Sequence, residues 1–239
     1  WSSDVCSSDL FADLATAGDF RLGSGYLSIL RAQAARLRGQ TDDALRTSLS
    51  ACAVLATSRV YAGLAHAERA QAAALRGDLE QARSAMEESD RSHAPGMAVL
   101  YPWREQARAA VLAAAGDLTG AADHLRDLAE QLRSDGFAGH EVLALYDLVR
   151  LGRADMQVGR TAGGASRCSV AHRLTELSDK VDGFLPPLLA RHARAASARC
   201  GEELLEVANA FAERELNLFA AEAAAMAVTR LRETRSQRA

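Results

Sequence analysis

The amino-acid sequence predicts an all-α fold, a superhelix of stacked antiparallel helix pairs. Three observations predict it: a recurring nine-residue stretch, an alanine-rich composition and apolar residues at helical spacing. Residues 31–39 read RAQAARLRG, residues 69–77 read RAQAAALRG and residues 108–116 read RAAVLAAAG, so the copies begin 38 and 39 residues apart. A period of this size is typical of a helical array, in which each helix pair buries its apolar faces against its neighbours.

Each copy ends in a glycine, and an alanine follows five residues later. Glycine adopts the left-handed conformation that ends a helix without a Cβ penalty. The alanine is small enough to let two helices approach closely just after the turn. We therefore interpret these positions as structural repeat positions: Gly39 and Ala44, Gly77 and Ala82, Gly116 and Ala121.

In the first helix pair, the first helix ends at Gly39 and either Thr41 or Asp42 can cap the second. Apolar residues three or four apart mark the buried face of each helix. These residues are Leu27, Leu30, Ala34 and Leu37 on the first helix, and Leu45, Leu49, Cys52 and Leu55 on the second.

In the second pair, Glu68 interrupts an otherwise apolar stripe, and Asp78 with Gln81 forms a candidate capping box after Gly77. In the third pair, Pro102 is expected in the first turn of its helix, where a missing N–H costs little. The apolar stripes are Tyr61, Leu64, Ala65, Ala72 and Leu75, then Leu79, Ala82 and Met86, then Leu100, Trp103, Ala107, Val111 and Ala114, then Leu118, Ala121, Leu125, Leu128 and Leu132.

The later units are less regular. Residues 155–168 (DMQVGRTAGGASRC) are glycine-rich and aperiodic, which predicts a loop, and Pro186 and Pro187 are expected to open a helix. Helical spacing recurs at Val142, Leu145 and Val149, at Val170, Leu174, Leu177 and Val181, at Leu188, His192 and Ala196, at Leu204, Val207 and Phe211, and at Leu216, Phe219, Ala223 and Met226.

The composition excludes several classes of protein. Hydrophobic residues make up 49% of the chain but aromatic residues only 5%, which argues against a β-sandwich or barrel. The net charge of −3 predicts no direct binding of nucleic acid. No stretch is long and apolar enough for a membrane span, and no signal peptide is present, so a cytoplasmic location is expected. The four cysteines form no CxxC pair, and we interpret them as small buried hydrophobes.

The chain divides into three parts on this interpretation. Residues 1–10 (WSSDVCSSDL) are what a common sequencing adapter encodes in one frame, so we expect a translated adapter without ordered structure; a genuine polar arm is the alternative. Residues 11–232 form the helical array, and residues 233–239 form a basic tail that frays.

No catalytic motif is found. The sequence contains no GxxxxGK[ST], no GxSxG and no HExxH, and the stretch 159–164 (GRTAGG) lacks the Lys-Ser/Thr pair of a phosphate-binding loop. The six histidines do not fall at i, i+4 spacing. We therefore predict no catalytic residue, no cofactor and no metal site.

The aromatic group at the start of the third unit can be interpreted in two ways. Tyr101, Trp103 and Arg104 either pack at the beginning of a helix or contact a ligand or partner on the inner surface of the superhelix. Tryptophan and tyrosine offer large rigid surfaces with a polar group and are common at binding hot spots.

The array resembles tetratricopeptide (TPR) repeats, in which the second helix follows a glycine and carries an alanine five positions later, as in residues 77–82 (GDLEQA). The period here exceeds the usual 34 residues, so the units are TPR-like. The chain also resembles the helical region of large actinobacterial LuxR-type transcriptional regulators, the ATP-binding MalT-like group. The stretches that carry this likeness are 31–45, 63–82, 144–154, 174–183 and 220–232.

This second resemblance implies a sensor and scaffold region that binds a small-molecule inducer or a protein partner. In such regulators a nucleotide-binding domain precedes the array and a helix-turn-helix domain follows it, and we expect this chain to be a fragment that lacks both. A stand-alone TPR-like adaptor is the alternative, and an enzyme fragment is a third. Apolar end faces without capping units further predict self-association.

Overall fold

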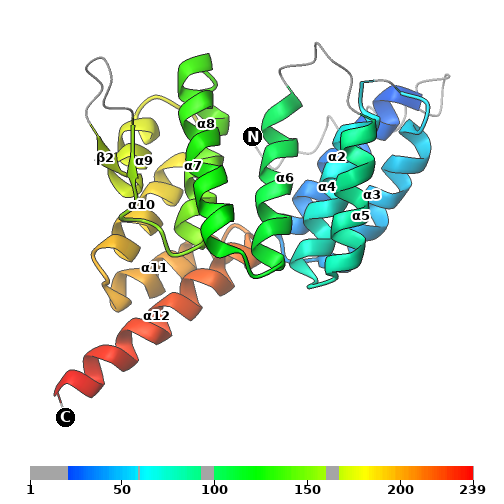
Figure 1. The fold of residues 1–239 in the computed structure, drawn as a ribbon. Helices are drawn as coiled ribbons and strands as arrows, with labels where there is room; N and C mark the ends of the chain where they lie inside the picture. Colours follow the sequence, from blue (N-terminus) through cyan, green and yellow to red (C-terminus); the bar gives the residue numbers. More distant parts are fainter. Residues whose placement is uncertain (1–20, 59, 93–99, 160–166, 239) are drawn as a thin grey trace. The chain divides into compact units, whose positions relative to one another are not determined.

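A computed structural model describes residues 21–58, 60–92, 100–159 and 167–238 (Figure 1). Over these residues the chain forms eleven α-helices and one hairpin of two very short strands. The all-α prediction is therefore confirmed. The proposed adapter at residues 1–10 lies outside the described residues. No helix among them is long and apolar enough to cross a membrane.

The chain divides into two compact units, Trp1–Ala121 and Ala122–Ala239. The helices of the first unit are α2 (Arg21–Leu37), α3 (Thr41–Leu55), α4 (Ala62–Leu75), α5 (Leu79–Arg91) and α6 (Tyr101–Ala114). Helix α7 (Leu118–Asp135) contains the boundary. The second unit contains α8 (Ala138–Arg150), β1 (Gln157–Val158), β2 (Cys168–Ser169), α9 (Val170–Ser178), α10 (Leu185–Ser197), α11 (Gly201–Ala212) and α12 (Asn217–Arg238).

The predicted glycine turns are confirmed. Gly39, Gly77 and Gly116 follow α2, α4 and α6 with φ angles of 76°, 75° and 85°. After α4, the Gly77 amide donates to the Ala74 carbonyl and the Asp78 amide donates to the Ala73 carbonyl, each at 3.0 Å. This pair of bonds is the Schellman motif, which satisfies carbonyls left free at a helix end.

The predicted alanine positions are also confirmed as buried contact points. Ala44, Ala82 and Ala121 are each 0% exposed. In each case the alanine amide donates to the carbonyl of the residue that follows the glycine, for example Ala82 to Asp78 at 3.0 Å. A side chain larger than a methyl group at these positions would have no space without moving a helix.

The helix caps follow the prediction in one pair and contradict it in another. Asp78 caps α5 by accepting a hydrogen bond from the Gln81 amide at 3.1 Å, as predicted. Neither Thr41 nor Asp42 caps α3, because both lie inside its first turn; Gln40 occupies the cap position without a side-chain hydrogen bond. The α3 helix begins directly after the Gly39 turn, with Gln40 as its cap residue, so both candidates lie within the helix.

In the first unit, α2 packs mainly against α3, and α4 packs against α3, α5 and α6; the contacts of α2 with α4 and of α5 with α6 are smaller. An apolar cluster of Ile29, Leu55 and Leu64 joins α2, α3 and α4. These contacts are those expected of stacked helix pairs. That the stack is a TPR-like superhelix stays a prediction.

The second unit is built differently. Helices α8, α9 and α10 pack on one another, and α11 packs between α10 and α12. Gly201 allows the close approach of α11 to α12, because a Cβ atom there would lie 2.6 Å from Leu231 Cγ. The centre of this unit contains the aromatic rings of Tyr146, Phe211 and Phe219.

Two predictions about irregular segments need correction. The predicted loop at 155–168 contains an antiparallel strand pair, in which Val158 is opposite Cys168; residues 160–166 lie outside the described part. The predicted fraying tail is helical as far as Arg238 (Figure 1). An ion pair one turn apart, Arg230 with Glu233 at 2.9 Å, supports this helix end. Pro102 and Pro186 do lie in first helical turns, as predicted.

Candidate functional site

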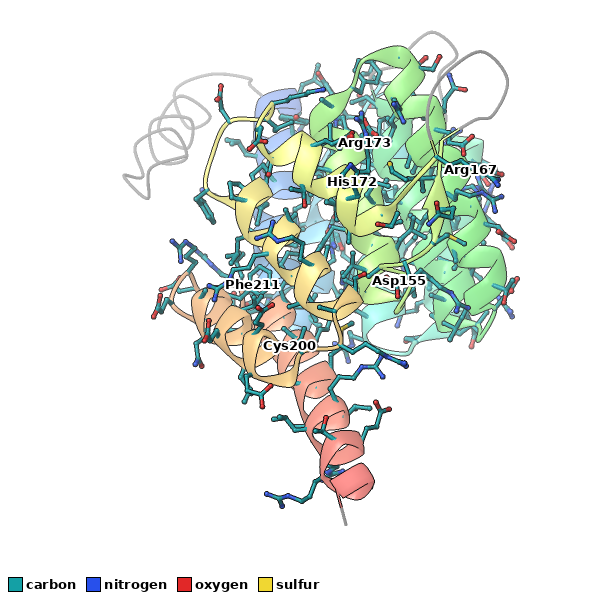
Figure 2. All side chains as sticks on the ribbon, turned by 90° about the vertical axis from the view of Figure 1, so that its left-hand side faces the viewer. Asp155, Arg167, His172, Arg173, Cys200 and Phe211 are labelled. Atoms are coloured by element: carbon teal, nitrogen blue, oxygen red, sulfur yellow. The ribbon has the colours of Figure 1, made fainter. Side chains whose placement is uncertain are left out.

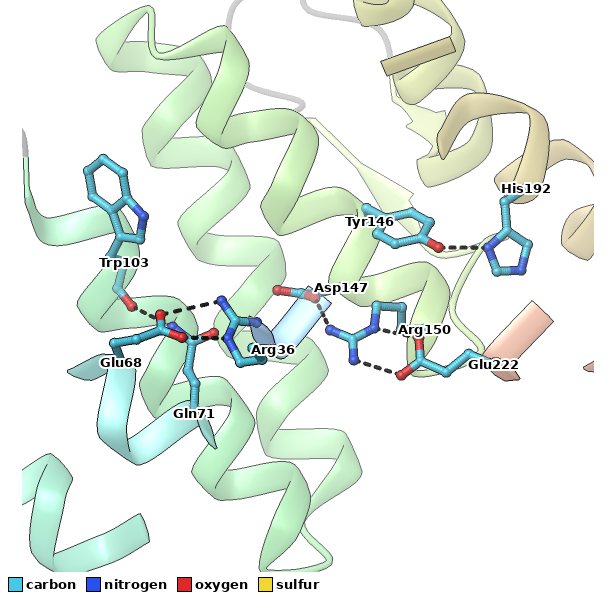
Figure 3. Close-up of polar contacts among 9 residues, drawn as sticks. All are labelled: Arg36, Glu68, Gln71, Trp103, Tyr146, Asp147, Arg150, His192 and Glu222. Carbon is cyan, nitrogen blue, oxygen red and sulfur yellow. Dashed lines mark hydrogen bonds and ion pairs between the residues drawn. The ribbon is translucent and has the colours of Figure 1, made fainter. Parts of the chain in front are cut away.

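The predicted contact group lies at the start of α6. Trp103 is half-buried and packs against the apolar cluster of α2, α3 and α4. Its backbone carbonyl accepts a long hydrogen bond of 3.5 Å from the Gln71 amide group (Figure 3). These contacts favour the packing interpretation for Trp103.

Tyr101 and Arg104 are three residues apart and therefore share one side of α6. Trp103, two residues after Tyr101, lies on a different side of the helix. Arg104 is partly buried and pairs with Glu105 at 3.3 Å. The three side chains therefore do not form one surface. A role for them in binding stays a prediction.

A buried ion pair joins α2 to α4. Arg36 Nε donates to Glu68 Oε1 at 2.8 Å, and the Glu68 side chain is 1% exposed (Figure 3). Burial raises the pKa of the Glu68 carboxyl group even though the charge of Arg36 lowers it. The sequence identified Glu68 as a break in an apolar stripe, but its partner lies 32 residues away in the previous helix pair.

A cysteine and a histidine also meet in the first unit. Cys52 Sγ lies 3.5 Å from His66 Nδ1. Burial raises the pKa of the Cys52 thiol to about 11. Burial thus opposes formation of the thiolate, which is the nucleophilic form of cysteine. Cys52 is buried as predicted, whereas Cys168 and Cys200 are only partly buried.

The second unit contains a polar contact inside its aromatic core. Tyr146 Oη lies 2.9 Å from His192 Nδ1, and His192 is 0% exposed (Figure 3). Burial, followed by the positive charge of Arg150, lowers the pKa of His192 to about 4. The histidine is thus neutral near pH 7. The sequence placed His192 on the helix face of Leu188 and Ala196 but could not identify Tyr146 as its partner.

Two further ion pairs connect helices of this unit. Arg150 donates to both carboxylate oxygens of Glu222, each at 2.7 Å, and so ties α8 to α12 (Figure 3). Arg173 donates to Glu141 at 2.7 and 3.0 Å and ties α9 to α8. Glu141 lies five residues after Gly136, where the first unit has alanine. At this position the second unit therefore has a residue of an ion pair, whereas the first unit has a small buried alanine.

A cavity of about 380 Å³ opens beside the turns that follow α8 and α10. Its apolar part is formed by Ala196, Leu204 and Met226, which belong to or pack against a buried cluster. Its polar part is formed by Asp155, Arg199, Thr229 and Arg230, with Gly152 and Ala154 completing the lining. Figure 2 labels Asp155, which lies between α8 and β1, and Cys200, the residue after Arg199.

The volume and the mixture of apolar and polar groups suit a small organic molecule. Sequence reasoning did not find this cavity. Its lining comes from four separate segments between 152 and 230, and no local pattern links them. Within the described residues, no group of His, Cys, Asp and Glu side chains is arranged to hold a metal ion.

Comparisons of the chain with protein-family models, with curated proteins and with solved structures found no match.

Proposed function

We propose that the chain is the non-catalytic sensor and scaffold region of a LuxR-type transcriptional regulator. In this role it binds a small-molecule inducer or a partner protein in the cytoplasm. Binding would then be transmitted to an ATPase domain and a helix-turn-helix domain encoded in the same gene. In this proposal the sensor and scaffold region does not contact DNA and needs no cofactor.

One observation carries this proposal: the same turn recurs in successive helix pairs of the first unit. Gly39, Gly77 and Gly116 share one backbone conformation, and the alanine five residues after each is fully buried. A repeated scaffold of this kind leaves the residues that differ between copies free to recognise a ligand. The second unit supplies a cavity of suitable size for an inducer.

The DNA on both sides of the coding region tests the regulator. We expect a Walker motif in frame upstream and a helix-turn-helix segment in frame downstream. A native start codon near residue 11 together with a stop codon after Ala239 would overturn the proposal and favour a stand-alone TPR-like adaptor.

Self-association is tested separately by sedimentation at increasing protein concentration; a constant monomer mass would contradict it.

A further inference from the structure

We propose that the cavity beside the α8 and α10 turns binds a small organic anion that carries an apolar body. The inference deepens the proposed function by giving the chemical class of the inducer. It is supported by the charge of one exposed arginine, by the backbone conformation that positions it and by the apolar floor of the cavity.

Arg199 supplies the charge. Its guanidinium group makes no hydrogen bond or ion pair with any other residue in the described ranges, whereas Arg230, the other arginine of the lining, is paired with Glu233. Asp155 is the one acidic residue among the described lining residues, and it accepts a hydrogen bond from the Ser197 hydroxyl group. Arg199 is therefore the group best able to receive an anionic oxygen from a ligand.

The backbone at Arg199 is unusual. Arg199 has φ of 55° and ends α10 with the same two hydrogen bonds that Gly77 makes possible after α4. A residue with a Cβ atom is disfavoured in this conformation, and glycine would occupy it without that cost. Residues held in such conformations are concentrated at ligand-binding positions. The turn thus holds a charged side chain at the cavity edge where glycine would give the more stable turn.

The floor of the cavity sets the rest of the ligand. Met226 and Ala196 are only partly buried and supply the accessible apolar surface, and they pack against a buried cluster that contains Leu204. The cavity volume of about 380 Å³ equals that of about a dozen water molecules at ~30 Å³ each. A carboxylate on a compact aromatic or branched apolar group of about that many atoms would fill it. The Asp155 carboxylate would disfavour a second negative charge on the ligand.

Binding of three probes by titration calorimetry and by NMR chemical shifts tests the inference with the full chain. The probes are 3-phenylpropanoate, which has the anion and the apolar body, 2-phenylethylamine, which replaces the anion by a cation, and inorganic phosphate, which lacks the apolar body. We expect saturable binding of 3-phenylpropanoate only. Absence of such binding, or equal binding of the amine or of phosphate, would overturn the proposal.

The variant Arg199→Gly provides the decisive comparison. It should fold with equal or higher thermal stability, because glycine suits the turn, and it should bind 3-phenylpropanoate about tenfold or more weakly, because a charge-assisted hydrogen bond is lost. Glu215→Gly is the matched control. Glu215 has φ of 59° in the equivalent turn after α11 and does not line the cavity. This control should bind the anion as the parent does. Unchanged binding in Arg199→Gly would overturn the assignment, and neither result depends on the neighbouring genes.

Discussion

The two units end their helices with the same backbone turn but build it from different residues. Within its described residues, the first unit uses glycine at these turns, at positions 39, 77 and 116, and a buried alanine five residues later. The second unit uses glycine at 136 and 152 but Arg199 and Glu215 in the later turns. The hydrogen bonds of the turn are the same in all these cases.

The interiors differ in the same sense. In the first unit the buried clusters consist mainly of alanines and a few aliphatic residues, and the rings of Tyr26, Tyr61 and Trp103 are only partly buried against them. In the second unit, the fully or almost fully buried rings of Tyr146, His192, Phe211 and Phe219 form a cluster in the core. The repeated feature is thus the backbone turn. The side chains that pack beside it differ, being mostly small alanines in the first unit and aromatic rings in the second.

The largest expected effect breaks the close packing of the first unit. Ala82→Arg places a long charged side chain at a position that is 0% exposed, so we expect a loss of several kcal/mol in unfolding free energy. Denaturant unfolding measures it. Ser84→Arg, on the exposed side of the same helix, is the control and should change stability little. Equal stability of both variants would contradict the close approach at Ala82.

The ion pair between α2 and α4 gives the next effect. Arg36→Ala leaves the Glu68 carboxylate buried without its partner, and we expect a loss of about 3–5 kcal/mol in unfolding free energy. Arg46→Ala removes an exposed pair with Asp43 and should cost less than ~1 kcal/mol. Similar losses in the two variants would mean that Glu68 is not held in a buried pair.

His192 predicts a pH dependence located in the second unit. Its pKa of about 4 in the folded chain lies below its unfolded value, about 6.5, so the unfolded chain binds a proton first as pH falls. The contribution of neutral His192 to the free energy of unfolding is fully present above about pH 6.5. It is lost as the pH falls toward 4, and the total loss is about 3 kcal/mol.

Burial also lowers the pKa values of His66 and His140, so they add to this dependence with the same sign. The double variant Tyr146→Phe with His192→Leu removes the polar pair without leaving either group unsatisfied. We measure the free energy of unfolding in urea at several pH values between 4 and 7. It should change less with pH in the double variant than in the parent. The same pH dependence in both proteins would show that His192 does not titrate as the structure implies.

The smallest effect tests the turn residue itself. Gly77→Ala should cost about 1–2 kcal/mol, because φ is 75° and no atom lies within 4 Å of the new Cβ, which leaves backbone strain as the cause. Gly139→Ala, in the first turn of α8 and equally free of nearby atoms, should instead leave stability unchanged or raise it by less than ~1 kcal/mol. A loss of stability in both variants would mean that the left-handed conformation of Gly77 is not the cause of the loss in Gly77→Ala.

Local patterns determined the turn positions that the sequence predicted correctly. Gly39 and Ala44 have short-range roles, since the turn bonds and the first bond of the next helix all lie within a few residues. The prediction was less successful where a residue has several local options. Thr41, Asp42 and Gln40 are adjacent, and the register of the Schellman turn decides which of them is the cap.

Pairs that are distant in the chain could not be predicted. Glu68 was visible as an anomaly, but its partner Arg36 depends on how two helix pairs stack. Tyr146 and His192 lie 46 residues apart, and each looks like an ordinary member of a helix face. The cavity is less predictable still, because Asp155, Arg199 and Arg230 converge only when four segments have packed.

The sequence by itself therefore determined the all-α class, the turns of the first three helix pairs and the small residues beside them. Their causes are local, because glycine and alanine act through backbone conformation and the absence of side-chain volume. Only the tertiary structure decided which charges are paired, which histidine is buried and where a ligand-sized cavity opens. Those features depend on distances between separate helices, and a helical pattern does not specify the residue that each face meets.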